Sequence, residues 1–170
     1  MLPKKVGEAL NKQIANEAYA SSSYLSMASW CDKEGLRGCA GFFYKQSDEE
    51  REHMLKLVKY VNEVGGHAVV TAIKEPPAEY KSVKQVFEIA LDQESEVTNQ
   101  INKLVDLSFS SKDFASFNFL QWYVQEQVEE ENLFRTILNI IKIAGDDDKA
   151  LLFIDNEIAN VRGKGEKEGD

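Results

Sequence analysis

Five polar residues lie on the inward-facing lines of long helical segments in this chain of 170 residues, where a helical bundle should be apolar. Elsewhere on these segments apolar residues recur at every third or fourth position, which indicates amphipathic helices around one core. The exceptions come from four different segments and are Glu17, Glu50, His53, Glu94 and Glu130. Four carboxylates and an imidazole could not stay together ionised in a dry interior unless a positive charge lay between them. The pattern therefore predicts a helical bundle that binds metal ions, and a pair of ions is the simplest solution.

Glycine and capping signals divide the chain into four long helical segments and a short one. The long segments are predicted at about residues 3–31, 36–64, from 82 onward and 111–144, and the short one begins near residue 146. Gly35, Gly65 and Gly145 follow the ends of three segments. Ser82 and Gln85 have the spacing of a capping box, which marks the start of the third segment. Because strand signals are nearly absent, the sequence predicts an all-α fold.

The connection between the second and third helices, residues 65–81, is too long for a tight turn. A helix of about 28 residues is roughly 42 Å long, and an extended segment of this length reaches at most ~60 Å. The connection can therefore run the whole length of the bundle, so that the second and third helices are parallel. We expect a four-helix bundle with one long crossover between helices two and three, plus a short C-terminal fifth helix. Residues 1–163 would form this single domain, and residues 164–170 a flexible polar tail.

The composition argues against several classes of function. The formal net charge of −9 leaves nothing to neutralise phosphates, which argues against a nucleic-acid partner. No apolar run is long enough to span a bilayer, and residues 1–7 lack the apolar run of a secretory signal. Cys31 and Cys39 are too few for a disulfide framework and are expected to be reduced. We therefore expect a cytoplasmic protein that binds neither nucleic acid nor membrane.

The types of candidate ligand favour iron or manganese. Glu50 and His53 are three residues apart, so both side chains point from one helix toward the same spot. Gln127 and Glu130 repeat this spacing on the fourth helix. Carboxylate oxygens with a single imidazole suit iron or manganese better than structural zinc, which takes more sulfur or nitrogen. A glutamate that bridges two divalent cations, with further carboxylates on each side, would balance their charge.

Together, these residues resemble those of a known family. The chain is similar over nearly its full length to non-haem ferritins of the prokaryotic type. The residues that carry the resemblance are Glu17, Glu49-Glu50-Arg51-Glu52-His53, Glu94 and Gln125-Glu126-Gln127-Val128-Glu129-Glu130-Glu131. The resemblance implies two iron ions in each subunit, with Glu50 bridging them. Its ligands for the first ion are Glu17, Glu50 and His53, and for the second Glu50, Glu94 and Glu130.

The same resemblance implies roles for residues around the two ions. Gln127 would lie beside the centre or near the bound oxygen species. Tyr24 would hydrogen-bond a ligand or supply an electron, and Trp122 would help in the same way. A third iron would be bound by Glu49, Glu126 and Glu129, which lie one step around each helix, and Glu130 would be a shared ligand. From the sequence alone, those three acids could equally form an ordinary solvated face.

The resemblance implies an iron-storage protein with ferroxidase activity. Such a protein oxidises Fe(II) with O2 or hydrogen peroxide and deposits ferric mineral inside a hollow 24-subunit homo-oligomer, with the fifth helix near a four-fold axis. Haem is not expected, because Glu52 stands where bacterioferritins carry their haem-binding methionine, and Met54 is out of register. The fourth helix has Gln127-x-x-Glu130 where bacterioferritins and related oxidases have a second Glu-x-x-His. This departure makes the two metal positions unequal and favours a centre that passes iron onward.

Two alternatives remain open at this stage. The first is a di-iron or di-manganese oxidoreductase of the same architecture that acts on peroxide or a small substrate, although the missing second histidine counts against it. The second is a non-catalytic helical scaffold or cation buffer whose acids only decorate the helices. The scaffold predicts that Glu17, Glu94 and Glu130 face outward.

Overall fold

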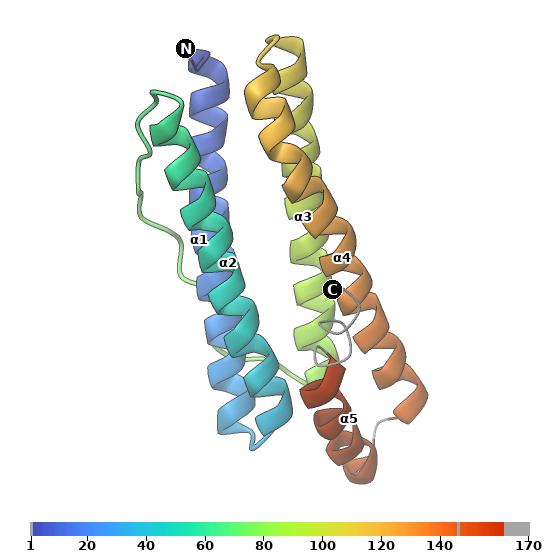
Figure 1. Cartoon of the computed structure of the whole chain (residues 1–170). Helices are drawn as coiled ribbons and strands as arrows, with labels where there is room; N and C mark the ends of the chain where they lie inside the picture. The colour runs from blue at the N-terminus through green and yellow to red at the C-terminus, as the bar shows by residue number, and fades with distance from the viewer. Residues whose placement is uncertain (1, 146, 162–170) are drawn as a thin grey trace.

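The computed structural model describes residues 2–145 and 147–161, and those residues form helices and no strand. The helices are α1 (Lys4–Lys33), α2 (Arg37–Glu63), α3 (Val83–Ser110), α4 (Phe114–Ala144) and α5 (Asp148–Val161). Four long rods lie side by side, and α5 packs across one end of the bundle (Figure 1). This arrangement confirms the prediction of an all-α, four-helix bundle with a short fifth helix. The predicted tail, residues 164–170, lies outside the described residues.

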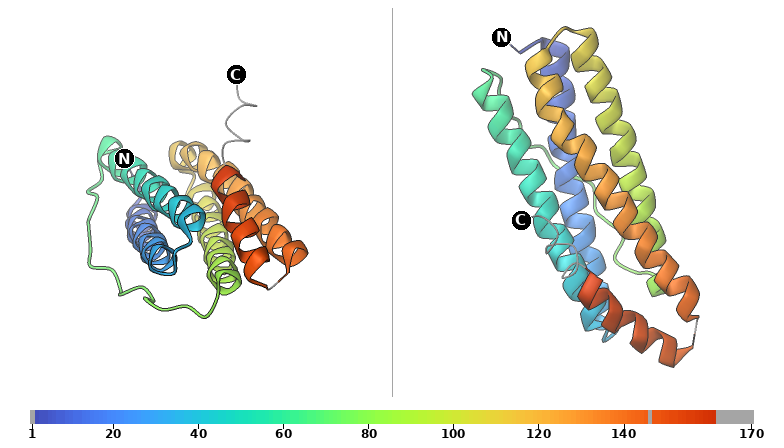
Figure 2. Two further views of the ribbon diagram at one scale, coloured as in Figure 1. Left: turned by 90° about the horizontal axis from the view of Figure 1, so that it is seen from below. Right: turned by 45° about the vertical axis from the view of Figure 1, so that its right-hand side comes forward.

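The long connection between α2 and α3 runs along the outside of the bundle from one end to the other (Figures 1 and 2). As a result α2 and α3 run in the same direction, while α1 with α2 and α3 with α4 form antiparallel pairs. The crossover predicted from the length of residues 65–81 is therefore confirmed. Its apolar residues Val69 and Val70 are exposed, as expected of a strap on the outside.

Local signals explain where the helices begin. Ser82 Oγ accepts a hydrogen bond from the backbone N–H of Gln85 at 3.2 Å, while Gln85 Oε1 accepts one from the backbone N–H of Lys81 at 2.7 Å. The capping signal at Ser82 is thus confirmed, although Gln85 reaches back one residue further than in the standard capping box. α4 begins at Phe114 rather than near residue 111. The cause is Lys112, whose φ of 57° interrupts the helical path before Asp113 caps α4.

The apolar core forms two clusters, one toward each end of the bundle. The cluster next to α5 is rich in packed aromatic rings such as Phe43 and Phe87, whose centroids are 4.8 Å apart. The cluster at the opposite end is mostly aliphatic, with Leu10 and Leu57 fully buried. Buried polar residues occupy the layer between the clusters on all four long helices. The two apolar clusters therefore keep water away from this polar layer at both ends.

α5 is fixed to the start of α2 by an unusual cap. The N-terminus of α2 has no side-chain cap of its own, and Asp155 of α5 supplies one. Asp155 Oδ2 accepts from the backbone N–H of Gly38 at 3.0 Å, and Oδ1 accepts from that of Cys39 at 2.8 Å. A Cβ atom at position 38 would lie 1.9 Å from the carbonyl oxygen of Asp155, so the close approach of the two helices requires glycine there.

The buried face of α5 is narrower than its apolar composition suggests. Ile154 and Ile158 are buried against the ring-rich cluster. Leu151 and Leu152 of the same helix are exposed. None of the helices in the described residues combines the length and the apolar character needed to cross a lipid bilayer.

Candidate metal centre

Three side chains from α1 and α2 converge in the polar layer of the bundle. Ligand atoms of Glu17, Glu50 and His53 all lie within 4.8 Å of one another. Glu50 and His53 reach the same spot because they are separated by one turn of α2. The three residues are 1%, 2% and 6% exposed, so the cluster is buried. One imidazole nitrogen and two carboxylates at this spacing form a set of ligands that a divalent cation could bind without large movements.

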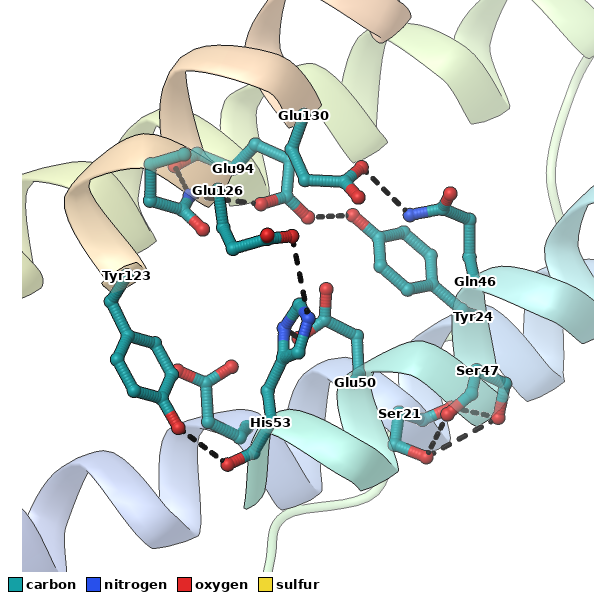
Figure 3. A network of polar contacts seen from close by, with 12 residues as sticks. Ser21, Tyr24, Gln46, Ser47, Glu50, His53, Glu94, Tyr123, Glu126 and Glu130 are labelled. Carbon is teal, nitrogen blue, oxygen red and sulfur yellow. Dashed lines mark hydrogen bonds and ion pairs between the residues drawn. The ribbon is translucent and has the colours of Figure 1, made fainter. Parts of the chain in front are cut away.

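Neighbouring groups orient these three side chains. Glu17 Oε1 accepts a hydrogen bond from Gln13 Nε2 at 2.8 Å, but its buried Oε2 has no hydrogen-bond partner within the described part of the chain. His53 Nδ1 lies 3.4 Å from Glu50 Oε2. The hydroxyl of Tyr123 donates to the carbonyl oxygen of His53 at 2.7 Å, which fixes this turn of α2 (Figure 3). A buried carboxylate oxygen without a donor is costly for a protein alone, and it is what a metal ligand would leave free.

Electrostatics in the cluster favours a cation. Burial raises the pKa of Glu17 well above its ordinary value, and the nearby charge of Glu50 raises it further. Burial also raises the pKa of Glu50, with the charge of Glu94 as the next cause. For Glu94, burial and then the charge of Glu130 raise the pKa to about 7. In the absence of a cation these acids therefore tend to retain protons, and a divalent cation that displaces the protons would relieve both burial and repulsion.

Glu94 and Glu130 face the same interior from α3 and α4, but hydrogen bonds hold them outside the compact group. Tyr24 donates to Glu94 Oε1 (Figure 3). Gln127 Nε2 donates to Glu94 Oε2 at 3.0 Å. Gln46 Nε2 donates to Glu130 Oε2 at 2.9 Å. The structure therefore brings together the three ligands predicted for the first ion. The ligands predicted for the second ion are on the same layer, but Glu94 and Glu130 would have to exchange these donors to reach it.

The acids predicted for a third ion line an open pocket next to the cluster. The pocket has a volume of about 730 Å³, and its walls include Glu49, Glu126, Glu129, Glu130 and His53. Glu126 Oε2 lies 3.8 Å from His53 Nε2. Burial raises the pKa of Glu126, while the nearby His53 lowers it. These acids therefore do not form an ordinary solvated helix face. They line a pocket that is open to solvent and reaches the buried imidazole of His53.

A cationic side chain also stands in this pocket. Lys56 Nζ lies 3.5 Å from the centre of the Trp122 ring, and the same ring meets His53 edge-on at a centroid distance of 5.2 Å. Both Lys56 and Trp122 line the pocket. The acidic pocket therefore also contains a cationic side chain.

Comparison with known proteins decides the family. The family model described as Ferritin-like domain matches residues 7–144. The chain belongs to the ferritin family. The ferritin is 46% identical over 164 residues to a probable bacterial non-heme ferritin-like protein of Haemophilus influenzae, which covers 96% of this chain and 99% of that relative. It is 43% identical over 161 residues to the bacterial non-heme ferritin of Campylobacter jejuni, with 95% of this chain and 96% of the relative covered.

Solved structures agree with this assignment. The ferritin superimposes with a TM-score of 0.91 and 43% identity on the open pore ferritin of the hyperthermophilic archaeon Archaeoglobus fulgidus, covering 94% of this chain and 98% of that one. A closed form of the same archaeal protein, engineered by site-directed mutagenesis, matches with the same TM-score of 0.91. The resemblance to prokaryotic non-haem ferritins is confirmed, and with it the assignment as an iron-storage protein of this family.

The burial of the acids decides against one of the alternatives. Glu17, Glu94 and Glu130 are 1%, 1% and 6% exposed, so the scaffold with outward-facing acids is wrong. The roles of the individual site residues stay predictions.

Tyr24 and Gln127 were predicted beside the centre, but further residues that hold the ligands in place were not among the predicted site residues. Gln13 and Gln46 were visible as polar residues on inward lines, which was a usable signal. Thr98 gave no comparable signal, because it lies next to Val97 and off the inward line of its helix.

Proposed function

We propose that this ferritin is a ferroxidase, with Fe(II) as the substrate of the centre described above. The observation that carries the proposal is the buried group of Glu17, Glu50 and His53, with ligand atoms within 4.8 Å of one another. The first Fe(II) binds to these three residues. The second binds to Glu50, Glu94 and Glu130, so that Glu50 bridges the two ions. Gln127 and Tyr24, which donate to the two oxygens of Glu94 before an ion binds, lie beside this second position.

Electron balance explains why two ions should be bound together. Two Fe(II) ions provide two electrons, which with two protons reduce one O2 to hydrogen peroxide or one hydrogen peroxide to two waters. Carboxylate oxygens favour Fe(III) over Fe(II), so the ligand set assists oxidation. The apolar clusters on both sides limit the access of bulk water to the centre.

The acidic pocket offers the oxidised iron a way out of the centre. We propose that Glu49, Glu126 and Glu129 bind a third ion there, sharing Glu130 with the second position. Support comes from the position of all four residues on the walls of one pocket of about 730 Å³ that also reaches His53. An ion leaving the centre would find carboxylates at each step, which lowers the electrostatic barrier to its transfer.

Storage requires a container that a single bundle cannot provide. We propose that the chain assembles as a 24-subunit homo-oligomer and deposits ferric mineral inside it. The similarity to ferritins described in open and closed pore forms supports assembly into a cage. Three further expectations stay predictions. They are the position of α5 near a four-fold axis, the cytoplasmic location and the lack of haem.

The test is the aerobic oxidation of Fe(II), followed by absorbance of the ferric product. Glu50→Gln and His53→Ala should each abolish the rapid phase at two ions per subunit while leaving the elution volume of the assembly unchanged. Glu63→Gln is the matched control, because Glu63 is an exposed carboxylate at the end of the same helix. Rapid oxidation by the Glu50→Gln, His53→Ala double variant at the wild-type rate would refute the assignment of the centre.

A further inference from the structure

We propose that Thr98 and Glu131 are positioning residues for the second metal position, acting through the carboxamide of Gln127. The inference deepens the proposed function and rests on it. Neither residue belongs to the predicted ligand sets. Both lie between α3 and α4, on the wall of a pocket of about 270 Å³ that also includes Gln127 and Arg135.

A continuous chain of hydrogen bonds links the centre to the surface at this point. Glu94 accepts from Gln127, and Gln127 Nε2 also lies 3.3 Å from Thr98 Oγ1. The Thr98 hydroxyl donates to Glu131 Oε1 at 2.6 Å. Glu131 Oε2 in turn accepts from Arg135, whose side chain is 56% exposed. The order follows from the helices, because Glu94 and Thr98 are one turn apart on α3, and Gln127 and Glu131 are one turn apart on α4.

Glu131 sets the direction of the two hydrogen bonds made by the Thr98 hydroxyl. A hydroxyl has one proton to donate, and the proton of Thr98 points at the carboxylate of Glu131. Thr98 must therefore present a lone pair to Gln127, and only the amide nitrogen of Gln127 can satisfy it. This contact holds the carboxamide in one of its two orientations.

The number of acceptors around Gln127 shows when Thr98 matters. The two N–H groups of Gln127 have three acceptors within reach, namely the carbonyl oxygen of Glu94 at 3.1 Å, Glu94 Oε2 at 3.0 Å and Thr98 Oγ1 at 3.3 Å. In the metal-free protein one acceptor is thus redundant. When the Glu94 carboxylate turns to a metal ion, the carbonyl oxygen and Thr98 remain, and both N–H groups are still satisfied. Without the Thr98 hydroxyl, one buried N–H would be left without an acceptor only in the metal-loaded state.

This asymmetry gives a specific prediction for Thr98→Val, which removes the hydroxyl and nearly keeps the shape. We expect the second metal equivalent to bind roughly tenfold more weakly, because an unsatisfied buried donor costs about that much in affinity. The first equivalent should bind as in the wild type, since Glu17, Glu50 and His53 do not contact Thr98. Thr98→Ser keeps the hydroxyl and should bind both equivalents within about twofold of the wild type.

The experiment is an anaerobic titration of the assembled protein with Co(II), followed through its visible ligand-field bands. Thr71→Val, in the exposed crossover, is the control for the same chemical change away from the centre. Glu131→Gln tests the second member of the pair. It should weaken binding of the second metal equivalent by a smaller factor than Thr98→Val does, because the Thr98 hydroxyl is kept but can then rotate away from residue 131. Melting temperatures of the metal-free variants should stay close to that of the wild type.

Two results would overturn the inference while leaving the proposed function intact. One is a Thr98→Val protein that binds two equivalents as the wild type does. The other is equal weakening of both equivalents in Thr98→Val and in Thr98→Ser, which would indicate a general packing role. A wild-type protein that binds no Co(II) in the bundle would refute the proposed function itself, and the inference with it.

Discussion

Replacing Glu94 by glutamine should change how the stability of the metal-free protein depends on pH. Glu94 is 1% exposed, and burial, followed by the charge of Glu130, raises its pKa from the ordinary 4.5 to about 7. A carboxyl group with a raised pKa binds its proton more tightly in the folded state than in the unfolded state. Its contribution to stability is therefore complete below pH 4.5 and is lost as the pH rises through about 7.

The size of this loss follows from the pKa difference. At 1.36 kcal/mol for each pH unit between the two pKa values, Glu94 accounts for up to about 3 kcal/mol of unfolding free energy. Glutamine has nearly the same shape but no proton to lose, so Glu94→Gln should remove this part of the pH dependence. Glutamine also alters the hydrogen bonds with Tyr24 and Gln127, but that change is the same at every pH. The slope with pH, rather than the absolute stability, is the informative quantity.

The assay is denaturant unfolding in the presence of a chelator, at one protein concentration and at several pH values between 5 and 8. The wild-type protein should lose stability across this range more steeply than Glu94→Gln. Glu88→Gln is the matched control, an exposed carboxylate on the same helix, and should follow the wild-type slope. Equal slopes for the wild type and Glu94→Gln would mean that burial does not hold a proton on Glu94, and the electrostatic argument for a cation in the bundle would lose its support.

Three further predictions concern α5 and the acidic pocket. Gly38→Ala should lower the unfolding free energy by about 2–3 kcal/mol, because its Cβ would lie 1.9 Å from the backbone oxygen of Asp155, and thermal unfolding would measure this. Asp155→Ala removes the acceptor of two backbone N–H groups at the start of α2 and should lower the unfolding free energy by roughly 1–2 kcal/mol in the same assay. Asp155→Asn should lower it less, because its one carbonyl oxygen can still accept one of the two N–H groups. The combined change of Glu49, Glu126 and Glu129 to glutamine should slow later turnovers of Fe(II) oxidation more than the first rapid phase in stopped-flow measurements. No change in either phase would mean that these acids bind no third ion and are only solvated surface residues.

The helices and their order could be predicted from the sequence because both depend on local or statistical signals. The spacing of apolar residues shows which side of each helix is buried, and Glu17, Glu50, Glu94 and Glu130 interrupt that side in every long helix. The crossover followed from the length of a segment without helical spacing. Each of these arguments needs only the chain itself and no knowledge of how two helices rotate against each other.

The hydrogen bonds around the acids could not be predicted in the same way. Whether Thr98 meets Gln127 or solvent depends on a rotation of α3 against α4 that the spacing of apolar residues does not define. The capping of α2 by Asp155 requires the position of α5, which could be predicted from the sequence only as a short helix. The start of α4 was misplaced because a single residue in the left-handed region, Lys112, is not a typical turn signal.

In the proposed assignment of the ligands, the same hydrogen bonds predict that the two metal positions fill in order. Glu17, Glu50 and His53 lie close enough to bind an ion as they stand, and an orphaned oxygen of Glu17 gains a partner when they do so. The second ion must instead compete with internal donors for Glu94 and Glu130, and each bond it displaces reduces its net binding free energy. Because the second position is the weaker of the two and Glu130 also belongs to the wall of the acidic pocket, we expect iron to leave the centre from that position. A centre built from one ready and one exchangeable position suits a protein that treats iron as its substrate, since a fixed pair of ions would need both sets of ligands equally prepared.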